Sequence, residues 1–289
     1  MSRFLVLAVC VIVLTVRAPA QELPYFVTYS HHMEEPGSLE IELKMTTGKP
    51  GSGSRFVGFP FEIEYGTRAW WTSEFYLEGQ TTAADSTVFT GLRIENRLRL
   101  LLSEHFINPV LYVEFEDING ANRSILEVVG HDGQGDVSGF NAETRVEKKR
   151  EVELKAIFSS NAKGWNFSEN FIAEKNITHA PWEFGYAVAA SRPLRLEGGT
   201  RNVIYAPENL AAGVEMYGGL GDTASLTMGN TSHYIGPVIN WSIPDGPTLS
   251  AGINFGLTSS SLPRIYRFGV SYEIGQLSRF FRAGARGDR

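Results

Sequence analysis

Hydrophobic and polar residues alternate along most of this chain. The clearest run is residues 39–45 (LEIELKM), where leucine, isoleucine and methionine alternate with glutamate and lysine. A period of two places successive side chains on opposite faces of an extended strand. The same period returns around Phe61 and Phe75 and recurs almost to the C-terminus. The pattern therefore predicts an all-β protein.

Twelve segments of this kind can be delimited, and an even number of antiparallel strands is typical of bacterial outer-membrane barrels. We predict strands at residues 39–45, 59–65, 71–77, 87–101, 109–117, 143–158, 164–174, 182–191, 209–218, 233–243, 248–257 and 265–274.

The connections between these segments carry a second signal. Barrels of this class have short periplasmic turns and longer outer loops. Long connections at 47–55 and 118–141 fall on the outer side, and short ones at 65–68 and 244–247 fall on the periplasmic side, as does 159–163. The connection at 192–208 is long on the periplasmic side, so it either carries local structure or marks a slip in the count. We predict a closed antiparallel transmembrane β-barrel of about 12 strands.

The last three predicted strands distinguish a membrane barrel from a soluble β-sandwich, whose apolar face would turn inward. In residues 248–257, leucine, alanine, isoleucine and phenylalanine occupy one face, while threonine, serine, glycine and asparagine occupy the other. Wide apolar faces with aromatic residues toward their ends fit a lipid-facing surface, and small polar residues fit a wet lumen. The pattern favours the barrel.

The chain opens with the pattern of a secretory signal peptide. Arg3 precedes an apolar stretch at residues 4–16, and small residues follow at Ala18 and Ala20. The stretch is shorter than the roughly 20 residues that a spanning helix needs. We expect cleavage after Ala20 and delivery to the cell outer membrane. The expected organisation is a signal peptide at 1–20, a periplasmic lead-in at 21–37, the barrel at 38–274 and a basic C-terminal tail at 275–289.

Composition excludes several classes of function. The chain has 26 Lys+Arg against 32 Asp+Glu and therefore lacks the basic footprint of a nucleic-acid-binding protein. The single cysteine, Cys10, lies in the predicted signal peptide, so residues 21–289 contain no thiol for disulfides, metal ligation or catalysis. We expect no cofactor. The expected partners are outer-membrane lipid, the barrel-assembly machinery and, if the lumen is open, small solutes.

The chain resembles a family of uncharacterised Gram-negative outer-membrane β-barrels over nearly all of residues 21–289. The matching stretches are YFVTYSHHMEEPGSLEIEL from Tyr25, INPVLYVEFE from Ile107, KGWNFSENFIAEKNI from Lys163, PWEFGYAVAASRPL from Pro181, VEMYGGLGD from Val214 and RFGVSYEI from Arg267. The resemblance implies the fold and the compartment and no activity. The chain departs from the usual aromatic C-terminus of such barrels by continuing from Gly275 as GQLSRFFRAGARGDR.

The densest charge pattern lies on the predicted inward faces of the fourth to sixth strands. The candidate lumen-lining residues are Arg93, Glu95, Arg97, Arg99, Glu114, Glu116, Glu147, Lys149 and Glu151. We expect Arg93, Arg97 and Arg99 to pair mainly with Glu114, Glu116 and neighbouring acids, because desolvating an unpaired charge in a narrow lumen costs several kcal/mol. The mixed signs permit two interpretations, a selectivity lining for a solute or a self-neutralised ladder that fills the lumen.

Two other motifs contain residues suited to chemistry. His31 and His32 are weak candidates for a metal site, because adjacent side chains in an extended segment point in opposite directions. We predict no metal there and expect the segment to pack in the lumen or at the periplasmic rim. Gly130-His131-Asp132-Gly133 is the nearest match to the His-x-Ser pair of outer-membrane phospholipases. Gly stands where the nucleophile would be, so we predict no enzyme.

The favoured function is a passive outer-membrane channel or solute-uptake pore. The alternative is a closed structural or partner-binding barrel without a conducting pore, and a lipid hydrolase is the least favoured. A twelve-strand barrel is near the size at which side chains either fill the interior or leave a narrow pore. The sequence leaves both open.

Overall fold

A computed structural model describes residues 23–124, 128–178, 181–196, 204, 206–275 and 277. The predicted signal peptide, most of the predicted C-terminal tail and His179 lie outside these residues. The elements are β1 (Leu39–Gly48), β2 (Phe56–Gly58), β3 (Phe61–Arg68), β4 (Trp71–Thr82), β5 (Thr87–Arg99), β6 (Asn108–Asn119), α2 (Asn141–Thr144), β7 (Lys148–Ala162), β8 (Trp165–Asn176), β9 (Glu183–Pro193), η1 (Pro207–Asn209), β10 (Leu210–Asp222), β11 (His233–Ser242), β12 (Thr248–Gly256) and β13 (Arg264–Ile274).

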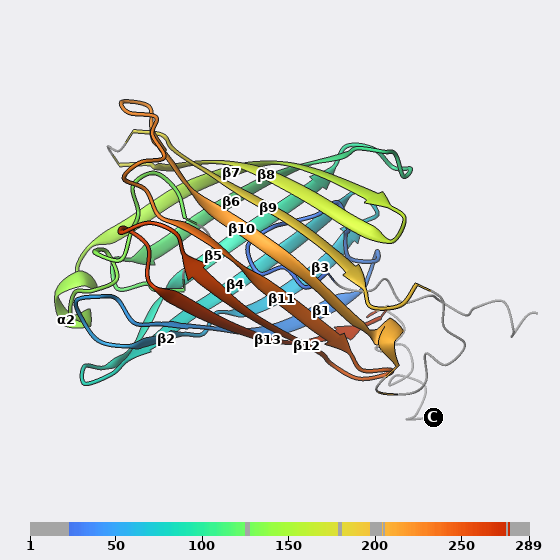
Figure 1. Cartoon of the computed structure of the whole chain (residues 1–289), viewed down its shortest axis with the longest axis horizontal. Coiled ribbons are helices and arrows are strands. Elements are labelled where there is room, and N and C mark those ends of the chain that lie inside the picture. Colours follow the sequence, from blue (N-terminus) through green and yellow to red (C-terminus); the bar gives the residue numbers. More distant parts are fainter. Residues whose placement is uncertain are drawn as a thin grey trace, which may run out of the picture.

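The strands form one closed antiparallel barrel (Figure 1), in which β13 pairs with β1. Both β2 and β3 pair with β1 on one side and with β4 on the other. They are two halves of one strand that is interrupted at Phe59 and Pro60, and Pro60 has no N–H to donate to a ladder. The barrel therefore has twelve strands around its wall, as the alternating pattern predicts.

The two ends of the barrel differ (Figure 1). The last strand, β13, ends at one end of the barrel, and α2 lies at the other, within the connection from β6 to β7. Short turns and longer loops alternate between the periplasmic and outer ends of such barrels. We therefore assign the end that carries α2 to the outside. The connection from β9 to β10 is long and contains η1, so local structure accounts for its length and the strand count does not slip.

The exterior is apolar where the barrel would meet lipid. Phe268 and Val270 on β13 are 46% and 47% exposed, whereas Arg267 and Ser271 on the opposite face are 0% and 4% exposed. This confirms the predicted register of the last strand, with large apolar groups outside and polar groups inside. Among the described residues no helix is long and apolar enough to cross a membrane.

Three predicted boundaries are wrong. The turn predicted at 159–163 lies mostly within β7, and the chain reverses at residues 163–164. The strand predicted from residue 143 begins at Lys148, because residues 141–144 form α2 instead. The buried Asn141 holds this turn in place, since its backbone N–H donates to Asp85 at 2.7 Å and its side-chain oxygen accepts from Gln80 at 2.8 Å. The turn predicted at 65–68 belongs to β3, and the chain reverses at residues 69–70.

Candidate functional site

The lumen contains a strap of N-terminal residues, 23–38, that is not part of the wall. It passes Gly252 on β12, where an added Cβ would lie 3.1 Å from the Phe26 ring. It then reaches the opposite wall, where the rings of Tyr29 and Tyr112 lie 5.1 Å apart. The strap leaves past Gly66, where an added Cβ would lie 2.1 Å from the Glu35 carbonyl oxygen. Only glycine permits that approach.

The strap is fastened in the lumen by polar contacts to several strands. Glu215 on β10, which is fully buried, accepts hydrogen bonds from the backbone N–H groups of Val27 at 2.8 Å and Thr28 at 2.7 Å. Asn170 on β8 accepts from the Tyr29 N–H at 2.6 Å and donates to its carbonyl at 2.8 Å. Hydrogen bonds to a charged acceptor contribute about 1.5–3 kcal/mol each. Glu215 is therefore a principal anchor of the strap.

His31 and His32 form a second anchor near the periplasmic end. The His31 Nδ1 lies 2.7 Å from the Ser159 hydroxyl, and its Nε2 lies 3.1 Å from the Glu104 carboxylate. The two histidine rings are 4.7 Å apart because the backbone bends, and Asn161 lies 3.3 Å from the Nε2 of His32. Ser159 is only 2% exposed, so the chain of contacts fastens the strap and presents no accessible nucleophile.

Beside the strap, a network of buried charges fills the lumen. Arg97 binds Glu64 and Glu74, and its Nε lies 3.4 Å from Glu95. Arg93 binds Glu78 at 2.5 Å and Glu114 at 2.8 Å. Tyrosine hydroxyls donate to the same acids, with Tyr29 bound to Glu95 at 2.9 Å and Tyr76 to Glu74 at 2.6 Å. Glu95, Glu114 and Glu153 have no exposed area, so the lumen is filled at this level.

Carboxylate oxygens of Glu62, Glu64 and Glu74 lie within 4.8 Å of one another, which is close enough to share a metal ion. Protein cations already occupy this cluster. Lys44 binds Glu62 at 2.5 Å, and Arg97 binds the other two. The cluster is therefore part of the charge network.

The predicted lumen residues fall into three groups. Arg93, Glu95, Arg97, Glu114 and Glu116 are buried inside the barrel. Lys149 and Glu151 are half-buried and line a cavity in its outer half. Arg99 lies at the periplasmic end, 3.3 Å from Glu104.

One candidate needs correction. Glu147 precedes β7 and is exposed at the outer mouth, because the strand starts later than predicted. The predicted pairing with Glu114 is confirmed for Arg93, and Arg97 pairs with the neighbouring acids Glu64, Glu74 and Glu95 on β3, β4 and β5. Sequence reasoning missed Glu215, although a lone acid on the inward face of an otherwise apolar strand was a usable signal.

A cavity of about 160 Å³ lies in the outer half of the barrel, between the wall and the inward loop, residues 120–147. The loop is anchored by Val128 and Val137, which are buried in one apolar cluster with Tyr217 and Leu262. The same cluster includes Phe26 and Val27 of the strap. Strap and loop therefore restrict the lumen from opposite ends.

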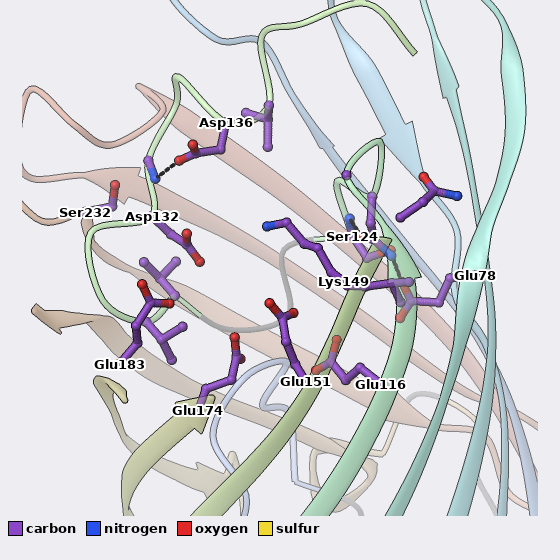
Figure 2. A pocket seen from close by; sticks show the side chains of 18 of the residues that line it. Glu78, Glu116, Ser124, Asp132, Asp136, Lys149, Glu151, Glu174, Glu183 and Ser232 are labelled. Carbon is purple, nitrogen blue, oxygen red and sulfur yellow. Dashed lines mark hydrogen bonds between the residues drawn. The ribbon is translucent and has the colours of Figure 1, made fainter. Parts of the chain in front are cut away.

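Acidic side chains dominate the lining of this cavity. Figure 2 shows Glu151 and Glu174 from the wall pointing into the same space as Asp132 from the inward loop. The ionisable lining residues are Glu78, Arg93, Glu116, Asp132, Asp136, Lys149, Glu151, Glu174 and Glu183. Burial raises the pKa of Asp132 to about 7, with Lys149 opposing the shift and Glu183 adding to it. The Asp132 side chain still faces the open cavity, so it can respond to a ligand.

The motif around His131 lies beside this cavity. The His131 Nε2 is 4.0 Å from a carboxylate oxygen of Asp222, and Gly133 lines the cavity next to Asp132. Gly133 donates its backbone N–H to Asp136 at 2.7 Å, a bond drawn in Figure 2. This motif shapes the loop and supplies Asp132 to the cavity.

The closed twelve-strand wall, the apolar exterior and the charged interior define an outer-membrane β-barrel. No family model and no curated protein matches the chain. Among solved structures, an outer membrane channel from Pseudomonas putida F1 is similar, with a TM-score of 0.52 and 11% identity over 87% of this chain and 98% of that one.

Two porins are similar with lower TM-scores. The KdgM porin in complex with disordered oligogalacturonate has a TM-score of 0.48 and 6% identity over 81% of this chain and 98% of that one. The NanC porin has a TM-score of 0.47 and 11% identity over 82% of this chain and 100% of that one. The similarity to the channel supports the fold.

Proposed function

We propose that this protein is an outer-membrane channel for small solutes and that the strap closes it. The observation that carries the proposal is that a separate segment, held by hydrogen bonds and by apolar contacts of Phe26 and Val27, fills a lumen whose wall is largely polar. A barrel that served only as a closed scaffold could fill its interior with apolar wall side chains at no cost in buried charge. Here the wall instead carries charged residues on the inward faces of β1 and β3 to β7.

The alternative is a permanently closed barrel in which strap and charge network form one rigid core. The cavity in the outer half of the lumen favours the channel, because side chains do not fill this half of the barrel. Movement of the strap would connect this cavity with the periplasmic end.

The test is liposome swelling with uncharged solutes of increasing size. The full chain is compared with a variant that lacks residues 23–36 and with the double variant Glu215→Ala/Asn170→Ala, which keeps the strap but removes two of its anchors. We expect little swelling with the full chain and faster swelling with both variants. Heat-modifiable gel migration checks that each barrel has assembled. If assembled barrels of all three kinds are equally impermeable, the closed-barrel alternative is correct.

A further inference from the structure

We propose that the lumen wall beneath the strap binds short extended peptides, and that short peptides are the class of solute that the protein admits. In the closed barrel the strap occupies this site as a built-in peptide. The proposal rests on the proposed function where it speaks of solutes. Binding of a peptide to the wall requires no conduction and can be measured separately.

The wall binds the strap through its backbone. Four consecutive N–H groups, those of residues 26–29, donate to two wall side chains. Glu215 accepts the first three at 3.4, 2.8 and 2.7 Å, and Asn170 accepts the fourth at 2.6 Å. The Asn170 amide also donates to the Tyr29 carbonyl at 2.8 Å. In the described part of the chain, every hydrogen bond of these two side chains goes to the strap backbone.

This pair of side chains suits a peptide better than other small solutes. Each peptide residue other than proline offers one N–H donor and one C=O acceptor at a fixed spacing. A carboxamide contains both an acceptor and a donor, so Asn170 binds the N–H and the C=O of one residue together. A sugar offers hydroxyls and a simple amine offers one charged group, and neither presents a row of amide donors to Glu215. The two side chains therefore select a chain of amides.

The side-chain contacts of the same segment are permissive. The Phe26 ring lies against β12, where an added Cβ on Gly252 would lie 3.1 Å from it, and the Tyr29 ring lies 5.1 Å from the Tyr112 ring. The Thr28 hydroxyl, in contrast, is buried without a hydrogen-bond partner in the described part of the chain. The wall therefore accommodates rings at the two ends of the segment and makes no hydrogen bond to the side chain of residue 28.

Withdrawal of the strap would leave Glu215 and Asn170 without their hydrogen-bond partners. The two side chains are 0% and 1% exposed in the closed barrel, and leaving buried polar groups unsatisfied is costly. A peptide that supplies the same N–H and C=O groups would replace the strap on the wall. Since such a peptide binds only the barrel with a withdrawn strap, its binding favours that state.

The test uses the full chain with a single cysteine in the strap. Residues 21–289 contain no cysteine, and Val27 is 1% exposed, so Val27→Cys provides one thiol that a maleimide reaches only when the strap withdraws. A ligand that binds only the vacated wall multiplies the labelling rate by 1 + [L]/Kd, where [L] is its free concentration. The concentration dependence of labelling therefore gives the Kd of each probe for the wall.

Two capped peptides and one sugar test the class of ligand. Acetyl-Phe-Val-Thr-Tyr-amide has the sequence of residues 26–29, acetyl-Phe-Ala-Ala-Tyr-amide keeps only its backbone and its rings, and maltotetraose is a sugar of similar length. We expect both peptides to accelerate labelling, with Kd values within about threefold of each other, and maltotetraose to have no effect. Acceleration by the first peptide alone would mean that the wall fits only the strap, and it would overturn the proposed solute class. Acceleration by maltotetraose, or by no probe, would overturn it as well.

Two N-methylated forms of the second peptide test the backbone contacts. An N-methyl group on the third residue removes the donor that corresponds to the Thr28 N–H, which lies 2.7 Å from Glu215. We expect the Kd to rise by roughly tenfold or more, because a hydrogen bond to a charged acceptor is lost. N-methylation of the first residue removes only the 3.4 Å contact and should have a smaller effect. Equal Kd values for the two forms would overturn the backbone contacts as the basis of binding.

Asn170→Ala then locates the site. This variant should raise the basal labelling rate, because the strap loses an anchor, and should also raise the Kd of the peptides at least threefold. Loosening of the strap alone would leave that Kd unchanged, and this result would overturn the assignment. Asp245→Asn, in the turn between β11 and β12, is the control and should change neither value. The N-methylated pair needs no wall variant, so it decides the matter if Asn170→Ala does not assemble.

The peptide site and the channel can fail separately. Peptide binding by a barrel that stays impermeable in liposome swelling would reject the proposed channel and keep the site. Swelling of liposomes without any effect of peptides on labelling would keep the channel and reject the site.

Discussion

The Glu215 carboxylate accepts the backbone N–H of Thr28 at 2.7 Å across 187 residues of sequence. Glu215 is fully buried, so its charge is stabilised mainly by the strap's N–H groups rather than by solvent. Glu215 therefore depends on the strap for hydrogen-bond donors, and the strap depends on Glu215 for an acceptor. The bond joins the wall to the strap, which lies in the lumen without belonging to a strand.

We expect Glu215→Ala to release the strap, because it leaves the N–H groups of Val27 and Thr28 buried without an acceptor. Leaving a buried donor unsatisfied costs about 1–3 kcal/mol. Limited proteolysis of the assembled barrel should cut residues 23–38 faster by roughly tenfold or more, since 1.4 kcal/mol is a factor of ten. Glu208→Ala, in η1 outside the lumen wall, is the control. Equal cleavage rates in the wild type and in Glu215→Ala would show that Glu215 is not an anchor.

Arg97→Met should destabilise the barrel strongly, because it leaves Glu64, Glu74 and Glu95 close together without their shared cation. Removing one partner of a buried ion pair costs about 3–5 kcal/mol. Arg150→Met removes an exposed arginine 3.5 Å from Asp117 and should cost less than about 1 kcal/mol. The stability of the two variants is compared by the temperature at which the folded band of each disappears in semi-native gels. Similar temperatures for both variants would contradict the role of Arg97 in the network.

Phe268→Arg should impair membrane assembly, whereas Phe268→Leu should not. The side chain is 46% exposed on the outer face of β13, where lipid would contact it. An arginine on the lipid face costs roughly 2–4 kcal/mol at the bilayer midplane and less toward the rims. The yield of heat-modifiable protein after refolding into vesicles measures the effect. Equal yields for the two variants would mean that this face does not meet lipid.

Acidification should loosen the strap. Burial lowers the pKa of His32 to about 4, with the neighbouring His31 adding to the effect and Glu104 opposing it. Burial also lowers the pKa of His31. A neutral histidine whose pKa is lowered by docking stabilises the docked strap at pH values above about 6.5, the ordinary pKa of histidine. This contribution is lost as the pH falls toward 4.

Proteolysis of the strap should therefore accelerate between pH 6.5 and pH 4, and His32→Gln should flatten that dependence. An acid-stable protease keeps the measurement valid across this range. An unchanged pH profile in His32→Gln would assign the effect to other groups.

The wall of the barrel could be predicted from the sequence, because the alternation of apolar and polar residues within each strand shows which side chains face lipid and which face the lumen. For the strap, the sequence predicted only that the segment around His31 and His32 packs in the lumen or at the periplasmic rim, which is confirmed. The contacts of the strap and the course of the inward loop could not be predicted, because neither segment has a period. Their positions depend on contacts such as Val27 with Glu215, which are 188 residues apart. Which of the neighbouring acids pair with Arg97 could not be predicted for a related reason. Alternation shows that the arginine faces inward, but the register and the reach of its side chain decide whether Glu64, Glu74 or Glu114 is closest.

The most direct test of the account is the single-channel conductance of the barrel without residues 23–36, recorded in a planar bilayer under a KCl gradient beside the full chain. We expect the full chain to conduct rarely and the deletion variant to conduct steadily. Its reversal potential should indicate a preference for K⁺ over Cl⁻, because acids outnumber bases along the outer cavity. An assembled deletion variant that carries no current would contradict the central claim that the strap closes a channel.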